Sequence, residues 1–116
     1  MKTTPLKLTP GILAAAACLS IAALAASGAD VAANWTAHCV SCHAKDGSGN
    51  TRMGRQAGAK DYRDAKVQAE LKDDAGLKAI KDGVTQKGKE VMKPFAEKLS
   101  DADIKSLAAY VKTFKK

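Results

Sequence analysis

Apolar residues in the downstream part of the chain recur at intervals of three and four, the spacing of amphipathic helices. Over residues 30–42 this spacing places Val31, Trp35, Cys39 and Cys42 on one side, together with a histidine. The pattern predicts a first helix over 30–42 whose apolar face includes both cysteines.

Two shorter helices are predicted in the middle of the chain. One follows Asp64, and the other begins near Asp73 or Asp74 and ends at Gly83. In each of them the apolar side chains stand about one turn apart. The residues concerned are Val67 and Leu71 in one helix, and Leu77 and Ile80 in the other.

The last helix has the clearest start signal. Ser100 suits the N-cap, Asp103 stands at the third helical position as in a capping box, and Leu99 with Ile104 suits a hydrophobic staple. An apolar stripe at helical spacing follows, made of Ile104, Leu107, Ala108, Val111 and Phe114.

Between these helices we expect two long loops, over 44–61 and 84–99, and no strands. The first is rich in glycine, and the second contains Met92, Pro94 and Phe95. Such loops are unusual in a small domain. An all-α fold whose two loops cover a large flat cofactor accounts for them.

The first 29 residues have the pattern of a secretory signal peptide. Lys2 and Lys7 precede an uncharged, Ala-rich run with small residues after it, so we expect cleavage between residues 25 and 29. The alternatives are an uncleaved anchor, for which the apolar run is short, and a lipoprotein acylated at Cys18. The lipoprotein reading is weaker because Ala15 stands where a larger aliphatic residue is usual. The mature domain is then 30–116, periplasmic, or alternatively membrane-anchored on the periplasmic side.

The mature domain is small and basic. Lys2 and Lys7 are among the 19 Lys and Arg, so 17 remain against 12 Asp and Glu, a net charge of +5. Basic and acidic residues are interleaved, which disfavours nucleic-acid binding and favours docking to acidic protein surfaces. A domain of this size has little apolar area to bury and commonly needs a metal, disulfide or cofactor.

Cys39-Val40-Ser41-Cys42-His43 is the attachment motif of c-type haem. Cysteines one helical turn apart reach two vinyl groups on one side of a porphyrin, and His43 then becomes an axial ligand of the iron. A zinc site would need two further ligands, a thioredoxin-type pair would need a βαβ unit, and a disulfide here would not call for a histidine.

Three side chains are candidates for the other axial ligand. His38 precedes the motif on the same helix, and Met53 lies only ten residues beyond His43. Met92 lies 49 residues beyond it, in a loop stiffened by Pro94, and is the preferred candidate.

Over residues 30–116 the chain resembles a bacterial class I cytochrome c. The resemblance rests on the haem motif, on Met92-Lys93-Pro94-Phe95, and on the helix opened by Leu99-Ser100-Asp101-Ala102-Asp103-Ile104. It implies about four helices and two long loops around one covalent haem c with His43 and Met92 on the iron. It also implies crossing first and last helices, with Trp35 packed against Leu107 and Tyr110.

Two features depart from this family. Val31 replaces a glycine common at the helix crossing, so the helices are expected to approach less closely. The chain also lacks the Gly-Pro pair whose carbonyl usually accepts a hydrogen bond from the ligand histidine. We therefore expect another carbonyl, near Arg52 to Gly54, to orient His43.

The predicted function is that of an electron carrier, not an enzyme. It would shuttle single electrons between redox proteins, helped by basic residues near the haem rim. The alternatives are a haem-based ligand-binding or sensor protein, and an electron-transfer subunit of a larger oxidoreductase complex. The basic residues expected near the rim are Lys45, Arg52, Lys60, Lys87, Lys89, Lys93 and Lys98.

Overall fold

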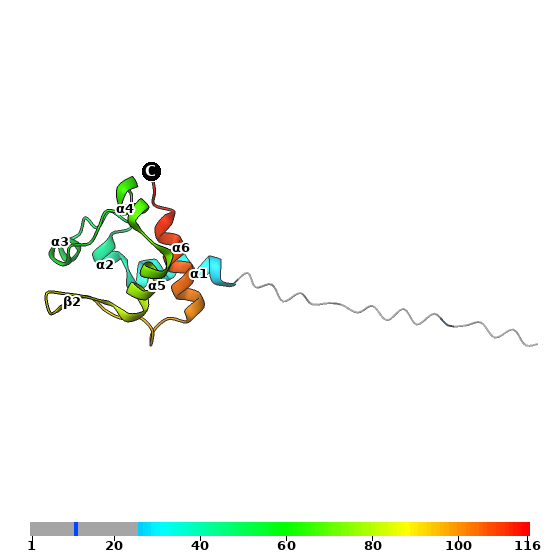
Figure 1. Ribbon diagram of the computed structural model, residues 1–116. Helices are drawn as coiled ribbons and strands as arrows, with labels where there is room; N and C mark the ends of the chain where they lie inside the picture. The colour runs from blue at the N-terminus through cyan, green and yellow to red at the C-terminus, as the bar shows by residue number, and fades with distance from the viewer. Residues whose placement is uncertain (1–10, 12–25) are drawn as a thin grey trace, which may run out of the picture.

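The structure, a computed structural model, describes residue 11 and residues 26–116 (Figure 1). These residues form six helices and one two-stranded sheet, so the predicted all-α class is confirmed. The helices are α1 (Ala26–His38), α2 (Val40–His43), α3 (Arg52–Ala57), α4 (Ala65–Glu70), α5 (Asp73–Asp82) and α6 (Asp101–Lys112), and the strands are β1 (Val84–Gln86) and β2 (Lys89–Met92).

The predicted signal peptide lies almost entirely outside the described residues and stays a prediction. Within the described part of the chain, no helix is both long and apolar enough to cross a membrane.

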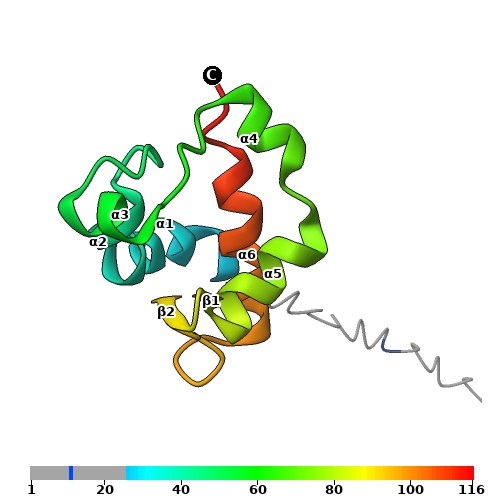
Figure 2. The same cartoon turned by 60° about the vertical axis from the view of Figure 1, so that its left-hand side comes forward.

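The core lies where α1 crosses α6 (Figure 2). Trp35, Leu99, Ile104 and Leu107 are its buried side chains, and Leu107 is only 1% exposed. The Trp35 ring meets the Tyr110 ring edge-on, with centroids 5.6 Å apart. The predicted packing of Trp35 at this crossing is thus confirmed. Burial of each leucine or isoleucine side chain in this core stabilises the folded state by about 1.5–3 kcal/mol.

The start of α6 follows the predicted capping chemistry. The Ser100 hydroxyl accepts a hydrogen bond from the Asp103 backbone N–H (3.1 Å), and the Asp103 carboxylate accepts one from the Ser100 backbone N–H (3.3 Å). Leu99 and Ile104 are both buried in the same core. These contacts satisfy amides that would otherwise lack partners at the helix N-terminus.

The two middle helices also begin and end close to where the sequence predicts. The Asp64 carboxylate accepts hydrogen bonds from the Lys66 and Val67 amides at the start of α4. Helix α5 begins at Asp73, and Gly83 is its C-cap residue, with φ of 75°.

Neither predicted loop is wholly irregular. The first contains α3, and the second contains the antiparallel β1–β2 hairpin, so the expectation of no strands was wrong. Lys87 and Gly88 form the hairpin turn, both with positive φ, as a type I′ turn requires. Figure 1 shows α3 and the hairpin on the same side of the molecule, away from the crossing of α1 and α6.

Candidate functional site

The haem motif lies at a break between two helices. Cys39 has φ of −116° and stands at the N-cap of α2, so the single helix predicted over 30–42 is in fact two. Helical hydrogen bonds nevertheless span the break, from the Cys39 N–H to the Trp35 carbonyl and from the His43 N–H to the Cys39 carbonyl, both 2.9 Å. Cys42 and His43 thus keep a helical relation to Cys39.

Ala44, directly after His43, is the C-cap residue of α2. Its φ of 63° and ψ of 163° belong to a region that glycine normally occupies. The Ala44 N–H donates to the Val40 carbonyl (3.0 Å), and the Ala44 carbonyl accepts from the Trp35 indole N–H (3.2 Å). These two bonds tie Ala44 to α2 and to the core.

The His43 ring contacts two aromatic side chains. The Tyr62 ring stacks on it with centroids 5.3 Å apart, and the Trp35 ring is 5.7 Å away at a tilt. Burial lowers the pKa of His43, which favours the neutral imidazole that a metal requires. The two rings therefore restrict the orientation of the imidazole, and burial favours its neutral form.

The Nδ1 atom of His43 is buried and has no hydrogen-bond partner among the described residues. The carbonyl expected from Arg52 to Gly54 therefore does not reach this atom. Instead, the Thr51 hydroxyl before α3 donates to the Ser41 and Cys42 carbonyls (2.7 and 3.2 Å). The residue that precedes helix α3 thus supports the haem motif by bonding to the backbone carbonyls of the motif.

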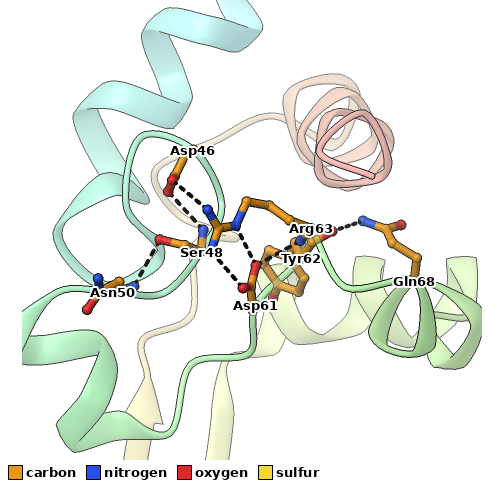
Figure 3. Close-up of polar contacts among 7 residues, drawn as sticks. All are labelled: Asp46, Ser48, Asn50, Asp61, Tyr62, Arg63 and Gln68. Carbon is orange, nitrogen blue, oxygen red and sulfur yellow. Dashed lines mark hydrogen bonds and ion pairs between the residues drawn. The ribbon is translucent and has the colours of Figure 1, made fainter. Parts of the chain in front are cut away.

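Tyr62 was not identified from the sequence. A polar network fixes the chain on both sides of it (Figure 3). The Arg63 guanidinium pairs with the carboxylates of Asp61 (2.9 Å) and Asp46 (3.2 Å). The Gln68 amide donates to the Tyr62 carbonyl (2.6 Å) and to a carbonyl of α6 (3.0 Å). No local pattern signals this aromatic contact, because it joins residues 19 positions apart.

A cavity of about 240 Å³ opens in front of His43. Cys39 and His43 line it from the motif, and Met92 lines it from the end of β2, whereas Cys42 is half-buried and is not among its lining residues. Its other walls are largely apolar, with charged side chains from the 60–73 segment and α6. They include Trp35, Tyr62, Leu71, Ala79, Ile80, Leu107, Val111, Lys60, Glu70, Lys72, Asp73 and Lys112.

The two other candidate ligands lie elsewhere. The Met53 side chain on α3 is 54% exposed and does not line the cavity. The His38 ring packs edge-on against Phe95 at 5.8 Å. The structure therefore brings Cys39, His43 and Met92 together and leaves Met53 and His38 outside this group.

These residues fit a haem. A half-buried imidazole and a thioether sulfur line one largely apolar cavity, and His/Met ligation of haem iron uses this donor pair. Burial, with a smaller effect of Cys42, raises the pKa of the Cys39 thiol to about 11. A catalytic redox pair needs the opposite shift.

Comparisons with known proteins agree with the assignment of a haem protein. The family described as "Cytochrome C oxidase, cbb3-type, subunit III" matches residues 25–111. The KustC0563 c-type cytochrome is similar in structure, with a TM-score of 0.68 and 36% identity over 75% of this chain and 99% of that one. A mutant of that cytochrome gives a TM-score of 0.65 and 35% identity over 74% and 99%. These similarities confirm the predicted small cytochrome c fold.

Proposed function

The chain belongs to the c-type cytochrome family described as cbb3-type subunit III, and from this premise we propose that it carries single electrons on one covalent haem c. Family and neighbours make it an electron-transfer haem protein. The finer proposal is that Cys39 and Cys42 form the thioether bonds and that His43 and Met92 are the axial ligands.

Each of these residues has a distinct role. The haem supplies an iron that changes oxidation state by one electron. His43, whose pKa burial lowers and whose ring contacts Trp35 and Tyr62, would provide a nitrogen ligand. Met92 provides a thioether, which favours the ferrous state and so raises the reduction potential.

The observation that carries the assignment is the placement of the two methionines. Met92 lines the cavity together with His43, whereas Met53 is half-exposed on α3. If His43 and Met92 both hold the iron, no position would be left open for a substrate. Such coordination would favour an electron carrier over a ligand-binding sensor.

Replacing each methionine with alanine tests this assignment. In the ferric holoprotein, Met92→Ala should abolish the weak long-wavelength band of methionine-ligated haem and admit cyanide. It should also lower the potential and let the ferrous form bind carbon monoxide. Met53→Ala is the matched control and should change none of these. Loss of the band in Met53→Ala with its retention in Met92→Ala would overturn the assignment. Carbon monoxide binding by the unmutated protein would favour the sensor.

We further propose that the redox partners have acidic surfaces. These surfaces would dock on a basic groove between α3 and the β1–β2 hairpin. Arg55, Lys87 and Lys89 line this groove, and no Asp or Glu is among the described residues that form it. Of the other basic residues expected near the rim, Lys60 lines the cavity itself. A positive rim accelerates encounter with a negative partner more than it strengthens the complex.

Reversing the charge of one residue in the groove tests whether partners dock there. Lys87→Glu should slow electron transfer to a negatively charged inorganic iron complex, speed transfer to a positively charged complex, and lose both effects at high salt. Lys105→Glu, an exposed substitution on α6 with the same charge change, is the control. Equal effects of the two variants would show that net charge, not the groove, governs encounter.

The proposed location is the periplasm, after removal of the first 25 to 29 residues. The intact mass of the exported protein should equal a chain beginning between residues 26 and 30 plus one haem. Retention of the leader in the membrane fraction would contradict this location and favour a membrane anchor.

A further inference from the structure

The segment that follows Met92 is tied to the C-terminal end of α5. The Phe95 N–H donates to the Ile80 carbonyl (2.9 Å), and the Ala96 N–H donates to the Lys81 carbonyl (3.2 Å). The last carbonyls of a helix have no partner within it. Here the chain just beyond Met92 supplies those partners, so the position of Met92 depends on α5.

Gly83 stands between α5 and the hairpin, directly beside Met92. In the hairpin, Val84 pairs with Met92. Gly83 itself has φ of 75° and ψ of −177°, a conformation that side-chain-bearing residues rarely adopt. Two independent contacts, the strand pairing and the helix-end hydrogen bonds, therefore hold the Met92 segment against this glycine.

A side chain at Gly83 would collide with that segment. A Cβ atom there would lie 2.5 Å from the Met92 carbonyl oxygen and 2.9 Å from the Pro94 nitrogen. Both atoms are backbone, so no side chain can rotate away. To reach the 3.4 Å of ordinary contact, the Met92 carbonyl would have to move by about 0.9 Å.

We propose that Gly83 is a positioning residue for Met92, because its bare Cα lets the 92–94 backbone lie against the end of α5. This inference rests on the proposed Met92 ligation. Bond formation between a sulfur and an iron tolerates little displacement, and the thioether is the weaker of the two axial ligands. A shift of the Met92 backbone would therefore weaken the sulfur–iron bond while leaving His43 in place.

Two glycine variants of the holoprotein separate this role from general destabilisation. Gly83→Ala holds an alanine at an unfavourable positive φ and also places its Cβ atom against the backbone of residues 92–94. Gly88→Ala, in the hairpin turn, adds a similarly unfavourable φ of 76° with no atom within 4 Å.

Gly83→Ala should weaken the long-wavelength band, lower the potential and raise the apparent cyanide affinity by about tenfold, as the population with open iron rises. Gly88→Ala should keep all three properties. An unchanged band, potential and cyanide affinity in Gly83→Ala would overturn the inference. Met92→Ala serves as the reference, because an unchanged band in that variant would instead refute the ligation itself.

Hydrogen exchange in the unmutated holoprotein provides a second test that does not depend on the folding of a variant. The Phe95 and Ala96 amides should exchange at least about tenfold more slowly than the Gly88 amide in the exposed turn, because their carbonyl partners belong to α5. Exchange of all three at similar rates would show that the end of α5 does not hold the Met92 segment.

Discussion

Replacing Ala44 with glycine should stabilise the protein, although it removes a half-buried methyl group. Ala44 has φ of 63° and ψ of 163°, and two hydrogen bonds hold it there, to the Val40 carbonyl and from the Trp35 indole. Glycine makes the same backbone bonds without the clash of a Cβ atom. The surrounding contacts therefore hold Ala44 in a strained conformation, and a glycine at this position would remove the strain.

The magnitude follows from three effects. Relief of this backbone strain contributes about 2 kcal/mol, from a range of about 1–3. The greater freedom of glycine in the unfolded chain opposes it by about 0.5–1 kcal/mol. Loss of half a methyl burial opposes it by about 0.4 kcal/mol. The net gain is about 1 kcal/mol, which for a domain of this size raises Tm by about 4–8 °C.

Thermal unfolding of the holoprotein, followed by circular dichroism, measures this effect. Ala109→Gly is the matched control, because Ala109 is exposed within α6 and its replacement should cost about 1 kcal/mol. The visible spectrum should be unchanged in Ala44→Gly. A fall in Tm similar to that of Ala109→Gly would refute the reasoning about strain.

Three further predictions concern the support of the site. Gly54→Ala would place a methyl group against the Cys42 carbonyl, so the unfolding free energy in urea should fall by about 1–3 kcal/mol; an unchanged midpoint would contradict this. The hydrogen bond from Arg63 lowers the pKa of Asp61 from 3.8 to about 2. The Asp61 contribution to stability is therefore complete above pH 3.8 and lost as the pH falls through about 2, and Asp61→Asn should flatten the stability curve across that interval. Ser100→Ala removes the N-cap of α6 and should cost about 1 kcal/mol in thermal unfolding, whereas an unchanged Tm would mean that the cap contributes nothing.

Local chemistry made the helix ends predictable. The Ser100–Asp103 box, the Asp64 cap and the glycine after α5 each act within a few residues, so the sequence pattern contains the whole cause. The haem motif is equally local, because its five residues determine its chemistry.

Other features depend on distant contacts. Helix α3 contains a glycine, which normally weakens a helix, but Gly54 is what allows α3 to pack against the backbone of α2. The hairpin turn is Lys87-Gly88 instead of the usual Asn-Gly. Tyr62 has no periodic partner near it in the sequence, and its stacking on His43 appears only when the loop closes.

The most direct test of the account is a redox titration of the unmutated exported protein, followed through its visible spectrum. The account predicts a single reversible one-electron wave, with about 59 mV per tenfold change in the ratio of oxidised to reduced protein. It also predicts that the long-wavelength band of methionine-ligated ferric haem disappears along that same wave. Two waves, an irreversible change, or a ferric spectrum without that band would contradict a single haem closed by His43 and Met92.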